Sequence, residues 1–172
     1  MLQLVNLLVD ICLLRRGPQH LPARRELTLF LIVAYGALAA AAEAWLGEPS
    51  QAFQWSVTSM VMLVGFIYGL LRWRGLLERF DQTVSAVAGC GVVYLLVYLP
   101  LSAALATPEG EPTSALAPLL VLVWILVFFW GFIIEGHIYR HALRLPLPGG
   151  VLVSVLIFAA ANGLYRQFFA AP

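Results

Sequence analysis

Apolar residues are gathered into five long blocks along the chain, separated by short polar stretches. The blocks cover residues 27–46, 52–71, 84–105, 115–139 and 147–165. Each is about twenty residues long, the length that an α-helix needs to cross about 30 Å of hydrocarbon at a rise of 1.5 Å per residue. We therefore expect an all-α protein, a five-helix transmembrane bundle.

The first fourteen residues, MLQLVNLLVDICLL, have a different pattern. Gln3, Asn6 and Asp10 are three and four positions apart, so they share one side of a helix that is otherwise apolar. A helix of this length rises about 21 Å, too little to cross the hydrocarbon, and the positive charges follow the apolar run instead of preceding it as in a signal peptide. We predict an amphipathic interfacial helix in the plane of the membrane, with a re-entrant, spanning or cleaved helix as the alternative.

Arginines give the expected orientation. The segment RRGPQHLPARR at 15–25 holds four of them among Gly and Pro residues that interrupt helices. With the N-terminus in the cytoplasm, that side holds nine of the ten basic residues, all Arg, and the other side holds Arg166 alone. Glu48, Glu109 and Glu111 fall in the outer loops. Because cytoplasmic loops carry the excess of positive charge, we expect a cytoplasmic N-terminus and a periplasmic C-terminus.

Composition excludes several classes of protein. The chain is 62% hydrophobic and only 11% charged, where soluble domains have about 25% charged residues. The five blocks leave no room for a soluble domain, so we expect one integral membrane domain, with the interfacial helix and Arg-rich segment at 1–26, the transmembrane helices at 27–165 and a short tail at 166–172. This rules out a cytosolic enzyme, a nucleic-acid-binding protein and a secreted disulfide scaffold.

Small residues recur at a spacing of four in most of the predicted spans, which lets helix backbones approach closely. The pattern comprises Gly65 with Gly69, Ser85 with Gly89, Ala159 with Gly163, and Gly36 with Ala40 and Ala44. We interpret these faces as contacts within the chain in preference to a homodimer contact. Cys12 and Cys90 lie in different segments without a CxxC pattern, and we expect both to pack as small apolar residues.

Polar residues that could carry chemistry gather at the inner end of the 115–139 block, in EGHIYRH at 135–141. His137 and His141 are four apart and share a helix face, a spacing that can hold a metal. Two ligands do not complete a tetrahedral shell, however, so we predict no metal and no cofactor, with both histidines at the interface. Glu135 and His137 diverge by about 200° around a helix, so they do not form one site.

Glu135 lies about 7 Å deeper than Arg140 by helix rise, and a carboxylate in hydrocarbon is costly. Our first interpretation is a buried ion pair with an Arg from another segment, for which Gly131 would leave room. The alternative is a proton-relay or substrate role. Asn162 is expected to make an interhelical hydrogen bond, and Glu43 to reach water.

The chain contains no catalytic constellation, so we predict no catalytic residue. The leading hypothesis is a non-enzymatic accessory or scaffold protein of the membrane. It would contact membrane lipid or a partner membrane protein through the N-terminal helix and its arginines, which are Arg15, Arg16, Arg24 and Arg25. A homo-oligomer is the other possible assembly. The same charges are also explained by topology alone.

Two other functions are kept as alternatives. The first is a small proton-coupled transporter that uses Glu135 and His137. The second, ranked lowest, is a lipid-modifying enzyme with His137, His141 and Arg140 around a phosphate.

The stretch LLRRGPQHLP at 13–22, followed by five spans, resembles small uncharacterised inner-membrane proteins of proteobacteria. The resemblance implies a bacterial inner membrane and an accessory role, with no catalytic residue to transfer. The topology is also similar to that of the Yip family, whose eukaryotic members are trafficking adaptors. The Yip motif residues are absent from the sequence, so that function is not carried over.

The orientation predicts how the loop around residues 72–79 behaves in intact cells. In a background in which Cys12 and Cys90 are replaced by serine, Glu78→Cys should resist a membrane-impermeant maleimide added from outside, and Glu109→Cys should react. Labelling of the Glu78→Cys protein from outside would invert the topology.

Overall fold

The computed structural model describes residues 2–46, 49–105 and 116–169, and all regular structure in them is helical. The helices are α1 (Leu2–Cys12), η1 (Pro18–His20), α2 (Arg25–Leu46), α3 (Pro49–Trp73), η2 (Leu77–Arg79), α4 (Phe80–Leu105), α5 (Ala117–Leu143) and α6 (Leu147–Phe169), where η marks a 3₁₀ turn. In this part of the chain, α2 to α6 are long and apolar enough to cross a membrane. The predicted multi-pass, all-α fold is confirmed, and Glu48, Glu109 and Glu111 lie outside the described residues.

Helix boundaries differ from the expected ones mainly at α5 and α6. Helix α5 continues to Leu143, so the whole EGHIYRH stretch is helical. It ends where Arg144 adopts a left-handed conformation at φ 57°, and the Arg144 and Leu145 amides both donate to the Arg140 carbonyl. Helix α6 runs to Phe169, into the residues expected to form a tail.

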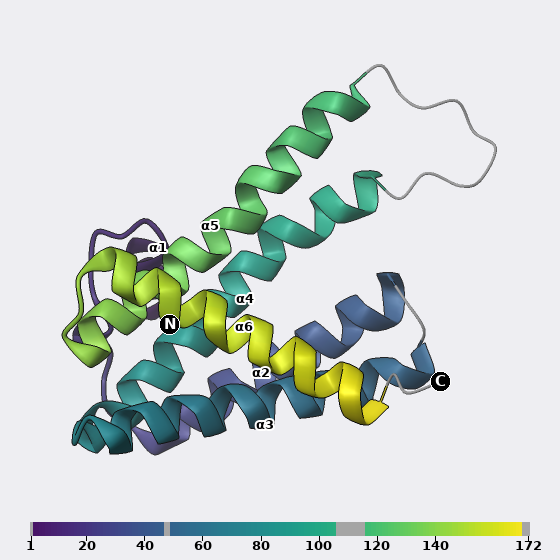
Figure 1. Ribbon diagram of the computed structural model, residues 1–172. Coiled ribbons are helices and arrows are strands. Elements are labelled where there is room, and N and C mark those ends of the chain that lie inside the picture. The colour runs from purple at the N-terminus through teal and green to yellow at the C-terminus, as the bar shows by residue number, and fades with distance from the viewer. Residues whose placement is uncertain (1, 47–48, 106–115, 170–172) are drawn as a thin grey trace.

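The long helices meet at one end and separate towards the other (Figure 1). Helices α4 and α5 run together as one arm, and they diverge from α3 and α6 (Figure 1). We call the end where the helices meet the arginine end, because α1, η1 and nine of the ten arginines lie there, and the other the open end. Buried residues concentrate near the arginine end, as in the unbroken buried run of α4 from Thr83 to Cys90.

Two glycines hold α5 against α6 near the arginine end. A Cβ atom added to Gly136 would lie 2.5 Å from Cγ2 of Val151 and 2.7 Å from its backbone. A Cβ atom on Gly150 would collide with the Gly136 carbonyl oxygen. The backbones are therefore in direct contact, which only glycine permits, and the two helices separate beyond this crossing.

The small-residue faces have mixed outcomes. Gly89 receives the side chain of Leu8 from α1, and the carbonyl of Gly36 accepts a 2.8 Å hydrogen bond from the Ser56 hydroxyl of α3. The expectation of contacts within the chain is confirmed for these two. It is wrong for Gly65 and Gly69, since a Cβ atom placed on either would have no described atom within 4 Å apart from its chain neighbours and the nearby backbone of its own helix. The same holds for Gly163.

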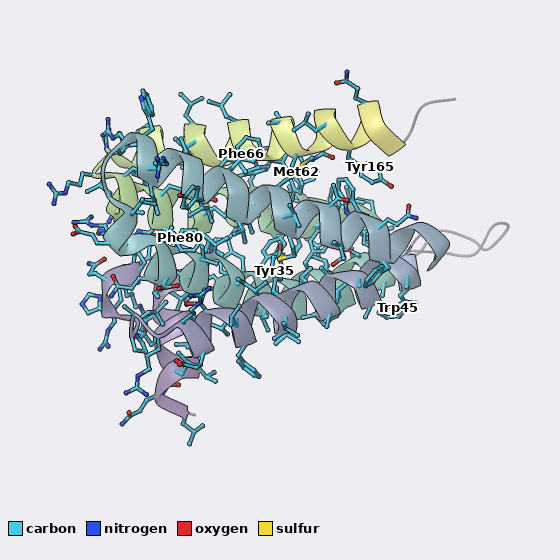
Figure 2. All side chains as sticks on the ribbon, turned by 90° about the horizontal axis from the view of Figure 1, so that it is seen from below. Tyr35, Trp45, Met62, Phe66, Phe80 and Tyr165 are labelled. Atoms are coloured by element: carbon cyan, nitrogen blue, oxygen red, sulfur yellow. The ribbon has the colours of Figure 1, made fainter. Side chains whose placement is uncertain are left out.

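Helix α1 packs on the inner half of α4 and buries Leu8, Ile11 and Cys12. It crosses the direction of the long helices, at the end of the bundle marked by Phe80 (Figure 2). This is the placement expected of an in-plane helix. Apolar side chains on its outer surface stay exposed, namely those of Leu2, Val5 and Val9, as does that of Leu13 directly after the helix.

The helix crossing predicts a stability difference between two glycine-to-alanine variants. Gly136→Ala inserts a methyl group into the backbone contact and should destabilise the protein by about 1–3 kcal/mol. Gly163→Ala faces open space and should change stability by less than about 0.5 kcal/mol. Thermal unfolding in detergent, followed by tryptophan fluorescence, would measure both. Equal midpoints would show that the crossing tolerates a side chain.

Candidate functional site

A cavity of about 310 Å³ lies between the helices, in the half of the bundle where they separate. All five long helices contribute to its walls, and we call it the central cavity. Glu135 and Ile138 line it on the side nearest the arginine end, and Glu43, Trp55 and Asn162 line it near the open end. The cavity therefore runs from mid-depth towards the open end.

Glu135 is the one charged residue on the inner part of this cavity. It is half-buried, and its Oε2 accepts a 2.9 Å hydrogen bond from the hydroxyl of Ser154, which is fully buried on α6. Among the described residues, this is the one hydrogen bond recorded for the carboxylate, and it involves Oε2 and not Oε1. One oxygen is thus fixed, and the other is left available to whatever enters the cavity.

The predicted ion pair between Glu135 and an arginine is wrong. Among the described residues the structure records one salt bridge, 3.3 Å between Arg16 and Asp10, at the arginine end. Arg74 and Arg79 instead donate hydrogen bonds of 3.0 and 2.8 Å to carbonyls in the last turn of α5. The physical reason is depth, because these guanidiniums satisfy free carbonyls at the membrane surface without leaving water.

Tyrosines occupy the space around Glu135 that the arginine was expected to fill. The ring of Tyr94 lies over Gly131, where an added Cβ would be 3.0 Å from it, and the ring of Tyr35 lies over Gly91 in the same way, at 2.7 Å. Tyr35 is in the middle of the bundle (Figure 2). Tyr139, one turn from Glu135, is buried, and its hydroxyl has no partner among the described residues.

Aromatic rings continue from Tyr94 towards the open end. Tyr94 and Tyr98 stack with ring centroids 5.4 Å apart, and Phe132 meets Phe158 edge-to-face at 5.3 Å, so the rings of α5 and α6 fill the wedge between these helices. The aromatic residues that line the cavity are Tyr35, Trp55, Tyr94, Tyr98, Phe128, Phe132 and Phe158. The walls are therefore largely aromatic and apolar.

The described wall of the cavity contains carboxylic acids and no basic side chain. Two of its lining residues are ionisable carboxylic acids, Glu135 and Glu43, and none of the described lining residues is Arg, Lys or His. Glu43 is exposed, in agreement with the expectation that it reaches water. The Asn162 amide donates to the Phe158 carbonyl in its own helix at 2.9 Å, so the expected interhelical hydrogen bond is wrong.

His137 and His141 share a helix face as predicted, with ring centroids 4.8 Å apart. His137 is nevertheless buried instead of interfacial, and its Nε2 is hydrogen-bonded at 2.8 Å to the Arg16 carbonyl. Arg140 donates to His141 at 3.3 Å. This face holds the N-terminal segment against α5, and neither histidine lines the cavity with Glu135.

Arg15, Arg16, Arg24 and Arg25 are all exposed at the arginine end. They form a cationic surface that is separate from the cavity. In the part of the chain that the structure describes, no group of three or more His, Cys, Asp or Glu residues is arranged to hold a metal ion.

Cys12 and Cys90 are both buried and free, as expected for small packing residues. Cys12 is on α1 and Cys90 is on the inner half of α4, on which α1 packs. The Cys90 thiol also lies 3.7 Å from the Leu8 carbonyl. The pair therefore belongs to the packing of α1 on α4.

We compared the chain with protein-family models, curated proteins and solved structures, and none of the three comparisons found a match. The resemblance to proteobacterial inner-membrane proteins therefore stays a prediction. The site has to be interpreted from its own geometry.

Ser154, Tyr35 and Tyr94 are parts of the site that the sequence analysis missed. Gly150 and Ser154 are four residues apart, which is the same small-residue spacing that marked other helix faces. That spacing could have indicated that this face of α6 packs against α5. The contacts of Tyr35 with Gly91 and of Tyr94 with Gly131 could not be found in this way. Each contact joins two different helices, so it leaves no regular spacing in the sequence.

The hydrogen bond between His137 and the Arg16 carbonyl, which holds the N-terminal segment against α5, can be tested by replacing His137. His137→Ala loses the hydrogen bond to the Arg16 carbonyl, a contribution of about 1 kcal/mol, so amide hydrogen exchange in residues 13–21 should become about fivefold faster. Mass spectrometry in detergent would measure this, with the exposed Arg144→Ala as control. Identical exchange in both variants would mean that the segment is held by other contacts.

Proposed function

We propose that this protein is a small carrier of the bacterial inner membrane that binds a small molecule in the central cavity, with Glu135 as the group that is alternately charged and neutral. The observation that carries the proposal is the free Glu135 oxygen at the inner end of a cavity reaching towards the open end. The volume of about 310 Å³ lies at the lower end of the range for small-molecule sites. This is the proton-coupled transporter of the sequence analysis with Glu135 alone as the titrating group, because His137 does not line the cavity.

A carboxylate at this depth favours such a role over a purely structural one. An ionised group in hydrocarbon costs about 2.5–3.5 kcal/mol on insertion scales. A structural carboxylate would be expected to form an ion pair, whereas Glu135 has a single serine donor. Protonation or a bound ligand would each offset the remaining cost. Tyr35, Tyr94 and Tyr139 are the titratable groups that surround it.

The orientation of the protein in the membrane determines the side towards which the cavity extends. The excess of arginine at one end favours placing that end in the cytoplasm. The central cavity then extends from mid-depth towards the periplasmic end, and the contact of α5 with α6 lies on its cytoplasmic side. Transport requires a second state in which the closed end separates.

The N-terminal surface supports a second candidate, the accessory role. Four exposed arginines next to the exposed apolar side of α1 suit anionic lipid headgroups or an acidic partner. Lipid modification is not proposed, because His137 is engaged with the Arg16 carbonyl and buried.

The carrier proposal predicts proton movement that depends on Glu135. Protein reconstituted in liposomes with an entrapped pH dye is given a pH gradient, and a panel of small cationic, anionic and neutral compounds is added. At least one compound should dissipate the gradient with the wild type, and Glu135→Gln should abolish the effect because its amide cannot release a proton. Glu26→Gln, an exposed position outside the cavity, is the matched control.

Equal dissipation by wild type and Glu135→Gln would contradict the proposal. So would a panel to which the wild type does not respond. Either result would leave the accessory role as the function that the surface supports.

A further inference from the structure

We infer that the central cavity takes an organic cation, a molecule with one positive charge on an apolar or aromatic body, and that the charge sits beside Glu135. This inference rests on the proposed ligand-binding role of the cavity. It adds the class of ligand, which the carrier proposal leaves open.

Charge is the first argument. The ionisable acids of the cavity wall are Glu135 and Glu43, one towards each end, and the described wall contains no Arg, Lys or His to balance them. The arginines nearest in sequence to Glu135 are at the arginine end, where Arg140 contacts His141. In a low-dielectric wall, an acid such as Glu135 without a basic neighbour favours a cation and repels an anion, and the exposed Glu43 adds charge of the same sign near the open end.

The aromatic wall is the second argument. Cations are attracted to the faces of tryptophan, tyrosine and phenylalanine rings, and organic ammonium groups are bound in this way in aromatic cages. Tyr35 and Tyr94 contribute rings next to Glu135, and Tyr98, Phe128, Phe132 and Phe158 continue the wall. Such a wall suits an apolar ligand body as well as its charge.

The same wall disfavours an inorganic cation. Ca²⁺ takes six to eight oxygen ligands, and Mg²⁺ demands a near-ideal octahedron of oxygens. Near Glu135 the cavity offers one carboxylate, with one of its oxygens already bonded to Ser154, among rings and aliphatic side chains. A cation that needs few direct ligands, such as an alkylated ammonium, matches this donor set.

Three compounds of matched shape test the inference. Phenyltrimethylammonium, methyl phenyl sulfone and benzenesulfonate each join a phenyl ring to a tetrahedral head, with charges of +1, 0 and −1. Calorimetry on the full chain in an uncharged detergent would measure binding. We expect the cation to bind at least about tenfold more tightly than the sulfone, and the sulfonate to give no binding.

Substitutions in the cavity wall test whether the positive charge of the ligand binds beside Glu135. Glu135→Gln should raise the Kd of the cation by about tenfold or more while leaving that of the sulfone unchanged. Glu135→Asp keeps the charge and should recover most of the affinity. Tyr94→Leu removes an aromatic face and should raise the cation Kd by about threefold. Thermal unfolding of each variant shows that it is folded.

The inference is overturned if the sulfone or sulfonate binds as tightly as the cation, if Glu135→Gln leaves cation affinity unchanged, or if the wild type binds none of the three. The outcomes separate it from the carrier proposal. Glu135-dependent cation binding without proton-coupled flux would retain the ligand class and remove the carrier. Flux of an anion or neutral compound without cation binding would do the reverse.

Discussion

The direct backbone contact between Gly136 of α5 and Gly150 of α6 is the constraint on which the rest of the arrangement depends. Because neither position has room for a side chain, the two helices touch near the arginine end, and their larger residues hold them apart beyond it. The rings of Phe132 and Phe158 fill the start of the wedge. What stays unfilled, between this wedge and helices α2 to α4, is the central cavity. The position of the cavity therefore follows from the position of two glycines.

Glu135 immediately precedes Gly136, so the helix contact and the carboxylate are set by adjacent residues. The same contact brings Ser154, one turn beyond Gly150, to within 2.9 Å of the Glu135 carboxylate. The glycine pair thus places both the acid and its donor. A single neutral donor does not balance an ionised carboxylate in hydrocarbon. This imbalance is what connects the packing of the bundle to its proposed chemistry.

Much of the fold could be predicted from the sequence, because hydrocarbon imposes a length and a composition on each helix. Spacing within one helix also predicted correctly that His137 and His141 share a face. It predicted correctly as well that Glu135 points in a different direction from His137. Partners from distant segments could not be predicted in this way. An arginine was the expected partner of Glu135 because opposite charges offset burial, but a guanidinium has a lower free energy at the surface, where carbonyls at the end of α5 accept its hydrogen bonds. The burial of His137 beneath Arg16, 121 residues away in sequence, likewise depends on how the N-terminal segment folds back.

The guanidinium groups of Arg74 and Arg79 on the carbonyls of Leu143 and His141 also affect the electric field in the bundle. The aligned peptide dipoles of a helix place about half a negative charge at its C-terminus. In α5 that pole lies about 12 Å from Glu135 along the axis, by the rise of eight residues. Two positive groups on the pole neutralise it, so the peptide dipoles of α5 do not add repulsion to an acid that already lacks a counter-ion. Arginines that a topology count treats as markers of the cytoplasmic side thereby help a negative charge to exist within the membrane.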